Sequence, residues 1–122
     1  MKSKLVIGLG NRLVPGDAAG LRCFDQLEHS AGGNDDVEFM HGGTDLLRLA
    51  KHMRGRDVIV LVDAASGADR TISLIEHGSR ELDDAQAHAH HLSAVQSLAL
   101  LRWSDEDIRR ARCYWVLIDE GA

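Results

Sequence analysis

The sequence holds few cysteines, a single proline and few aromatic residues, and it has no long hydrophobic run. Its two cysteines, Cys23 and Cys113, lie far apart and form no metal-binding spacing, so a disulfide framework is not expected and a reducing compartment fits better. The apolar stretch after Lys4 is too short for a signal peptide or a membrane span. We therefore expect a cytoplasmic protein without a membrane partner.

The charge pattern excludes a typical nucleic-acid-binding protein. The formal net charge is -5, aromatic residues make up 4% of the chain, and lysine and arginine are scattered along it. An acidic protein can still bind a basic peptide or a metal ion, and net charge does not decide between them. The 122 residues, 44% hydrophobic and 27% charged, suit one globular domain, so we expect residues 1–122 to form a single unit.

Short apolar runs predict five strands. The clearest covers residues 57–63, where the unbroken apolar stretch indicates burial on both faces, as in a parallel sheet. The other strands are expected over residues 5–9, 37–40, 71–75 and 114–118.

Apolar residues at helical spacing predict helices between these strands, over residues 20–31, 46–53 and 94–101. Acidic residues after Ser104 predict one more short helical turn, and the polar, histidine-rich residues 81–91 are expected to form a loop. Because strands and helices alternate, we predict an α/β fold of three layers, a mainly parallel twisted sheet with helices on both faces.

Candidate functional residues follow the strands, where ligands gather in sheets of this kind. They are Asp17 after the first strand, Asp63 at the end of the third, and a cluster of His88, His90 and His91 before the last long helix. Two carboxylates and an imidazole suit a divalent ion such as nickel or zinc.

Each candidate also has a structural interpretation. Asp17 fits the N-cap of the first helix, and Asp63 fits a residue that orients a loop by accepting from nearby backbone amides. A histidine-rich loop fits a solvated surface segment. All three groups, however, are predicted to meet at one edge of the sheet.

The turn at Gly8-Leu9-Gly10 resembles the start of a dinucleotide-binding fingerprint, but Leu13 stands where the third glycine belongs. Peptidyl-tRNA hydrolases also open with a strand and Gly-Leu-Gly-Asn. Their Thr-Arg-His-Asn-like segment is replaced here by Gly-Leu-Arg-Cys, and the acidic charge also argues against an RNA partner.

Four segments, in order, resemble the signatures of [NiFe]-hydrogenase maturation endopeptidases. Residues 5–13 and 16–20 resemble the first, a strand followed by Gly-Asn-x-Leu and then by acidic residues and glycines that open a helix. Gly42-Gly43-Thr44 resembles the second, and residues 60–64 resemble the third, a hydrophobic strand that ends in Asp-Ala. Residues 90–100 resemble the fourth, a histidine that opens a leucine-rich helix.

The resemblance implies an endopeptidase that removes the C-terminal extension of a [NiFe]-hydrogenase large-subunit precursor after nickel insertion. It implies that Asp17, Asp63 and His90 contact nickel, which arrives with the substrate, and that they form the site of peptide hydrolysis. His90 is preferred because its distance to the leucines of the helix matches the family. His41, His88 and His91 are possible extra ligands.

Several departures from the family pattern support an alternative, a non-catalytic metal- or precursor-binding assembly module of the same fold. The family's acidic pair is reduced to Gly16-Asp17, and His41 replaces the acid before Gly-Gly-Thr. The chain is also expected to lack the family's C-terminal helix. An apolar sheet face left uncovered in this way could be buried in a homodimer.

Overall fold

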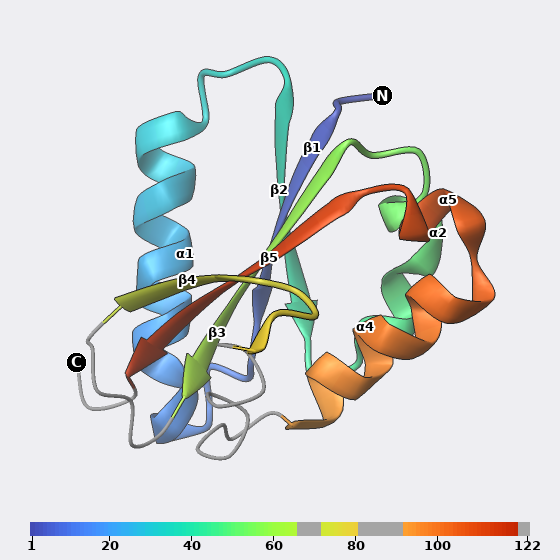
Figure 1. Cartoon of the computed structure of the whole chain (residues 1–122). Helices are drawn as coiled ribbons and strands as arrows, with labels where there is room; N and C mark the ends of the chain where they lie inside the picture. The colour runs from blue at the N-terminus through green and yellow to red at the C-terminus, as the bar shows by residue number, and fades with distance from the viewer. Residues whose placement is uncertain (66–71, 81–91, 120–122) are drawn as a thin grey trace.

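The computed structural model describes residues 1–65, 72–80 and 92–119. Its centre is a five-stranded sheet in the order β2-β1-β3-β5-β4 (Figure 1). β2, β1, β3 and β5 run parallel to one another, and β4 runs antiparallel to β5. The strands are β1 (Lys4–Leu9), β2 (Val37–Gly43), β3 (Val58–Ala65), β4 (Ile72–Glu76) and β5 (Arg112–Asp119).

Helices cover both faces of the sheet, so the predicted three-layer α/β fold is confirmed. The 3-10 turn η1 (Pro15–Asp17) leads into α1 (Ala18–Ala31), which packs on β1, β3 and β5 from one side (Figure 1). The other side carries η2 (Leu46–Leu49), α2 (Ala50–Met53), α4 (Leu92–Ser104) and α5 (Glu106–Arg109). None of the described helices has the length and apolar composition that crossing a membrane requires.

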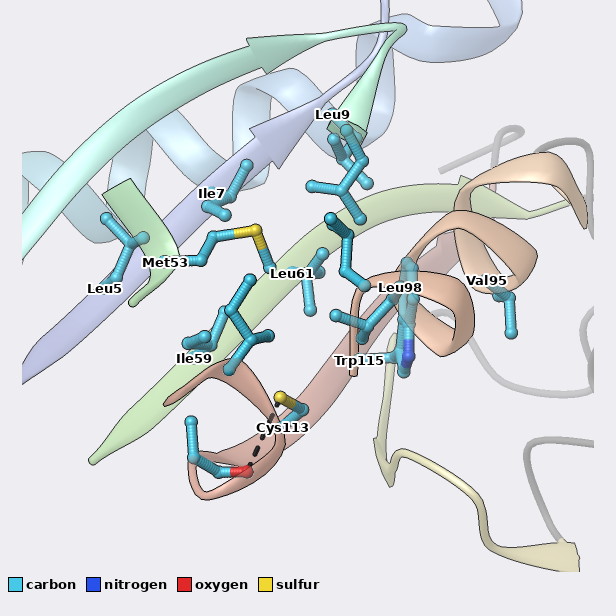
Figure 2. Close-up of a cluster of buried hydrophobic side chains, with 14 of the residues drawn as sticks. Leu5, Ile7, Leu9, Met53, Ile59, Leu61, Val95, Leu98, Cys113 and Trp115 are labelled. Carbon is cyan, nitrogen blue, oxygen red and sulfur yellow. Dashed lines mark hydrogen bonds between the residues drawn. The ribbon is translucent and has the colours of Figure 1, made fainter. Parts of the chain in front are cut away.

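The core is divided by the sheet into a larger and a smaller part. Because side chains alternate along a strand, Leu5, Ile7 and Leu9 of β1 point toward α4, and Val6 points toward α1. The α4 side holds Trp115, which is fully buried (Figure 2). The smaller α1 side is built around Phe24. Most of the apolar burial therefore lies beneath α2, α4 and α5.

Three element boundaries differ from the prediction. β3 continues to Ala65 because its pairing with β5 persists to Ala65↔Asp119, so Asp63 lies inside the strand and not at its end. β2 continues beyond the predicted end at residue 40, through His41 to Gly43, because β1 still pairs with these residues. The register of this pairing shifts between Gly8 and Leu9. The helix expected over residues 46–53 is divided into η2 and α2. Residues 81–91, predicted to form a loop, lie outside the described residues.

Arg56 is a buried cation that joins three segments. It is 5% exposed. Its guanidinium donates to the backbone carbonyls of His52 and Lys2 at 2.9 and 2.7 Å and to the Glu38 carboxylate at 2.7 Å. The Arg56 hydrogen bond holds the pKa of Glu38 below its usual value. These bonds tie the N-terminus and α2 to β2.

We expect Arg56→Ala to lower the free energy of unfolding by about 2–3 kcal/mol, because it removes three hydrogen bonds made by a buried guanidinium, including the ion pair with Glu38. Urea denaturation would measure the loss. Lys4→Ala is the matched control, since Lys4 forms a solvent-exposed ion pair with Asp36 at 2.8 Å and is expected to change stability far less. Equal losses in both variants would contradict the role given to Arg56.

His77 makes stability depend on pH. Trp115 donates its indole N–H to Nδ1 of His77 at 3.0 Å, so this nitrogen must be unprotonated. Burial, aided by the charge of Arg102, lowers the pKa of His77 from its ordinary value of 6.5. The unfolded chain therefore binds the proton more readily than the folded one. His77 contributes its stability above pH 6.5, and this contribution is lost as the pH falls through the lowered pKa.

We expect the wild-type protein to lose more stability between pH 7.5 and pH 5 than His77→Phe, which cannot titrate. Urea denaturation at both pH values would measure the difference. If the two proteins lose stability in parallel, other groups govern the pH dependence.

Candidate functional site

Asp17 lies at the carboxyl end of β1, where the chain turns into α1. It is 3% exposed, and its Oδ2 accepts from the backbone N–H of Asn11 at 2.7 Å. Gly10 makes this close approach possible, because its φ is +123° and an added Cβ would lie 3.0 Å from Cβ of Asp17. Asp17 occupies the N-cap position of α1, yet its side chain makes no capping hydrogen bond. The N-cap interpretation therefore does not explain its buried carboxylate.

Asp63 lies two residues before the end of β3 and is 2% exposed. Its Oδ1 accepts from the backbone N–H of Ala64 at 2.9 Å, but Ala64 belongs to β3, so this bond does not orient a loop. Gly20 of α1 packs directly on this part of β3. An added Cβ at Gly20 would lie 3.0 Å from the Ala64 nitrogen and 3.1 Å from the Asp63 carbonyl carbon. The first turn of α1 therefore packs closely on the strand that carries Asp63.

The two carboxylates occupy the same edge of the sheet. β1 and β3 are parallel neighbours, with Gly8 paired to Val62, and η1, which ends in Asp17, contacts β3. Burial of a carboxylate is costly unless it gains partners. Two such groups at the carboxyl edge, where α/β proteins bind ligands, are typical of a functional site. Carboxylate oxygens are also suitable ligands for divalent cations.

The histidine cluster of His88, His90 and His91 lies outside the described residues. Its membership in the site stays a prediction from the sequence.

His41, a possible extra ligand, lies in a different cluster near the end of β2. Its ring is tilted against Phe24, with ring centroids 4.6 Å apart, and its Nε2 lies 3.9 Å from Oδ1 of Asp25. His41, Asp25 and Glu28 offer ligand atoms within 4.8 Å of one another, but all three are exposed. Arg12 already donates to Asp25 at 3.0 Å, and this hydrogen bond holds the pKa of Asp25 below its usual value. The guanidinium of Arg12 therefore already pairs with one of the two carboxylates of this cluster.

Two adjoining hollows flank the end of β2. One, of about 300 Å³, is lined by Arg12, His41 and Thr44 and by the turn at Gly10 and Asn11. The other, of about 480 Å³, lies toward α2 and is lined by Arg48, Lys51 and His52 among others. His41 and Gly43 border both. Because Asn11 also donates to Asp17, the first hollow adjoins the buried carboxylate.

The basic residues of the second hollow were not among the predicted site residues. The helix over residues 46–53 was predicted from its apolar residues, but Arg48 and Lys51 are also spaced as neighbours on one helical face.

No protein-family profile matches the chain. Hydrogenase 2 maturation protease of Escherichia coli (strain K12) is 30% identical over 106 residues, which cover 84% of this chain and 65% of that protein. The structure of [NiFe] hydrogenase maturation protease HybD from Thermococcus kodakarensis matches with a TM-score of 0.75 and 29% identity, covering 98% of this chain and 80% of that one. In sequence and in fold, the chain is similar to [NiFe]-hydrogenase maturation proteases.

A second solved structure also has a similar fold. The hydrogenase maturating endopeptidase HybD from E. coli matches with a TM-score of 0.71 and 25% identity, over 98% of this chain and 74% of that one. The present chain thus has a fold similar to that of these two structures, and Asp17 and Asp63 lie at the carboxyl edge of its sheet. It spans slightly less than two thirds of the length of the curated E. coli relative.

Proposed function

We propose that this protein is an endopeptidase that removes the C-terminal extension of a [NiFe]-hydrogenase large-subunit precursor after nickel insertion. The observation that carries the proposal is the pair of buried carboxylates, Asp17 and Asp63, at the carboxyl edge of a maturation-protease fold. Relatives with this fold are named as hydrogenase maturation proteases and endopeptidases.

In this proposal, Asp17, Asp63 and His90 bind the nickel that arrives with the precursor. Two carboxylates and an imidazole are ligands that nickel accepts, and bound nickel could act as a recognition element and a Lewis acid. Asp17 and Asp63 are well suited to positioning, because backbone N–H groups of Asn11 and Ala64 hold their carboxylates. Fixing the precursor in this way would place the scissile bond where water can attack, and positioning supplies much of the rate.

The proposed location is the cytoplasm. Cys113 is buried, Cys23 is half-buried, and neither forms a disulfide. Thiols of this kind suit a reducing compartment.

The function is tested by mixing the purified protein with nickel-loaded large-subunit precursor and following the precursor's mass. We expect loss of one C-terminal peptide, and no loss from nickel-free precursor. A known maturation protease acting on the same precursor is the positive control. An unchanged mass beside an active control would overturn the peptidase proposal, and binding of the precursor without cleavage would identify a non-catalytic assembly module.

A further inference from the structure

The hollow of about 480 Å³ between the end of β2 and α2 concentrates positive charge in an acidic protein. Four basic side chains line it, from His41, Arg48, Lys51 and His52, and among the residues that the structure describes no carboxylate is part of its lining. The chain as a whole carries a net charge of -5. The lining residues come from β2, η2 and α2, so the fold places His41 beside the basic residues of the segment 48–52.

The charges of Arg48 and Lys51 are available to a ligand. Both side chains are exposed, and within residues 1–65, 72–80 and 92–119 neither forms an ion pair. By contrast, Lys4, Arg12, Arg54, Arg56 and Arg110 each pair with a carboxylate in the same part of the chain.

Two carboxylates that interact with the histidines of this hollow already have basic partners. Glu38, which interacts with His52, accepts from Arg56 at 2.7 Å. Asp25, which interacts with His41, accepts from Arg12 at 3.0 Å. Neither is left to neutralise Arg48 or Lys51.

We propose that this hollow binds the carboxylates of an acidic peptide segment, and, resting on the proposed function, that this segment belongs to the precursor. Guanidinium and ammonium groups form charge-assisted hydrogen bonds with carboxylates. An acidic polypeptide would be repelled by the net charge of the protein, so a local basic site is needed to dock it.

The position of the hollow favours a polypeptide over a small free anion. It shares His41 and Gly43 with the smaller hollow at Asn11, and Asn11 holds the carboxylate of Asp17. An extended chain can therefore lie along the carboxyl edge of the sheet, with one part near Asp17 and an acidic part between Arg48 and Lys51. This arrangement makes the basic hollow a docking subsite beside the candidate active site.

The test measures binding of a fluorescein-labelled hexaglutamate peptide by fluorescence anisotropy at low salt, with hexaglutamine as the uncharged probe. We expect hexaglutamate to bind and hexaglutamine not to bind. Arg48→Glu combined with Lys51→Glu is expected to weaken binding about tenfold or more, since two attractive pairs become repulsive. Lys2→Glu combined with Arg112→Glu is the matched control, because it makes the same charge change at exposed positions at the amino ends of β1 and β5, the opposite edge of the sheet. Circular dichroism confirms that both variants are folded.

Three results would overturn the proposal. The first is equal binding of the two peptides, and the second is an equal loss in both double variants, which would show a general charge effect. The third is displacement of hexaglutamate by inorganic phosphate or a short RNA at lower concentration than by unlabelled peptide, which would identify a phosphate site.

The binding assay requires no cleavage, so its outcome is separate from that of the peptidase proposal. In the processing assay, the Arg48/Lys51 double variant is expected to show a raised KM with little change in kcat. A protein that cleaves the precursor but does not bind hexaglutamate would refute the docking subsite alone.

Discussion

Asp63→Asn is expected to abolish nickel-dependent cleavage of the precursor while the protein stays folded. The amide is nearly the same size as the carboxylate, and its oxygen can still accept from the N–H of Ala64, as Oδ1 of Asp63 does at 2.9 Å. What is lost is the negative charge at a buried position. We expect kcat/KM to fall on the order of 100-fold or more. Initial rates of peptide release, followed by mass spectrometry, would measure it.

The matched control for this change is Asp57→Asn. Asp57 directly precedes the same strand but is exposed and lies at the opposite edge of the sheet, so its replacement is expected to leave cleavage unchanged. Thermal unfolding would show whether both variants are as stable as the wild-type protein. Cleavage by Asp63→Asn at the wild-type rate would remove Asp63 from the proposed site.

Trp115→Ala is expected to give the largest loss of stability. Trp115 is fully buried in the larger core cluster and donates its indole N–H to His77 at 3.0 Å. Truncation would leave a cavity beneath α4 and remove this hydrogen bond. Changes of this kind cost about 3–5 kcal/mol, which is a large share of the stability of a small domain. Urea denaturation followed by circular dichroism would give the change in the free energy of unfolding.

Trp103→Ala provides the comparison, because the chain's other tryptophan lies on α4 with 77% of its surface exposed. This substitution removes the same atoms from a position with little packing, so it is expected to change stability only slightly. A similar loss from both substitutions would mean that packing under α4 does not account for the stability.

The parts of the fold that followed from the sequence are those fixed by local pattern. The apolar run before Asp63 and the alternation in β1 identify strands without knowledge of the pairing strand. Burial on both faces, or on alternate faces, produces a pattern that is visible in neighbouring residues. Strand ends were less predictable. Ala64 and Ala65 belong to β3 because β5 pairs with them, and Gly43 belongs to β2 because β1 pairs with it. Such pairing partners are distant in sequence.

The candidate site was predictable to a similar degree. Asp17 and Asp63 stand near strand ends, so their place at one sheet edge followed from topology. Their burial did not, because it depends on tertiary contacts: Asn11 turning back on Asp17, and Gly20 packing on the backbone of β3. The basic hollow was predictable only in part: the spacing of Arg48 and Lys51 is visible in the sequence, but the position of His41 of β2 beside η2 and α2 depends on the tertiary fold.

The interior place of β5 has a consequence for how the protein is made. β5 comprises residues 112–119, yet it lies between β3 and β4, and both strands hydrogen-bond to it. While a ribosome is still synthesising the preceding residues, one backbone edge of β3 has no partner, and the core beneath α4 lacks Trp115. The sheet therefore closes only after this segment has emerged, through contacts of high sequence separation that form slowly. Until then the nascent chain exposes the type of strand edge that chaperones protect from aggregation.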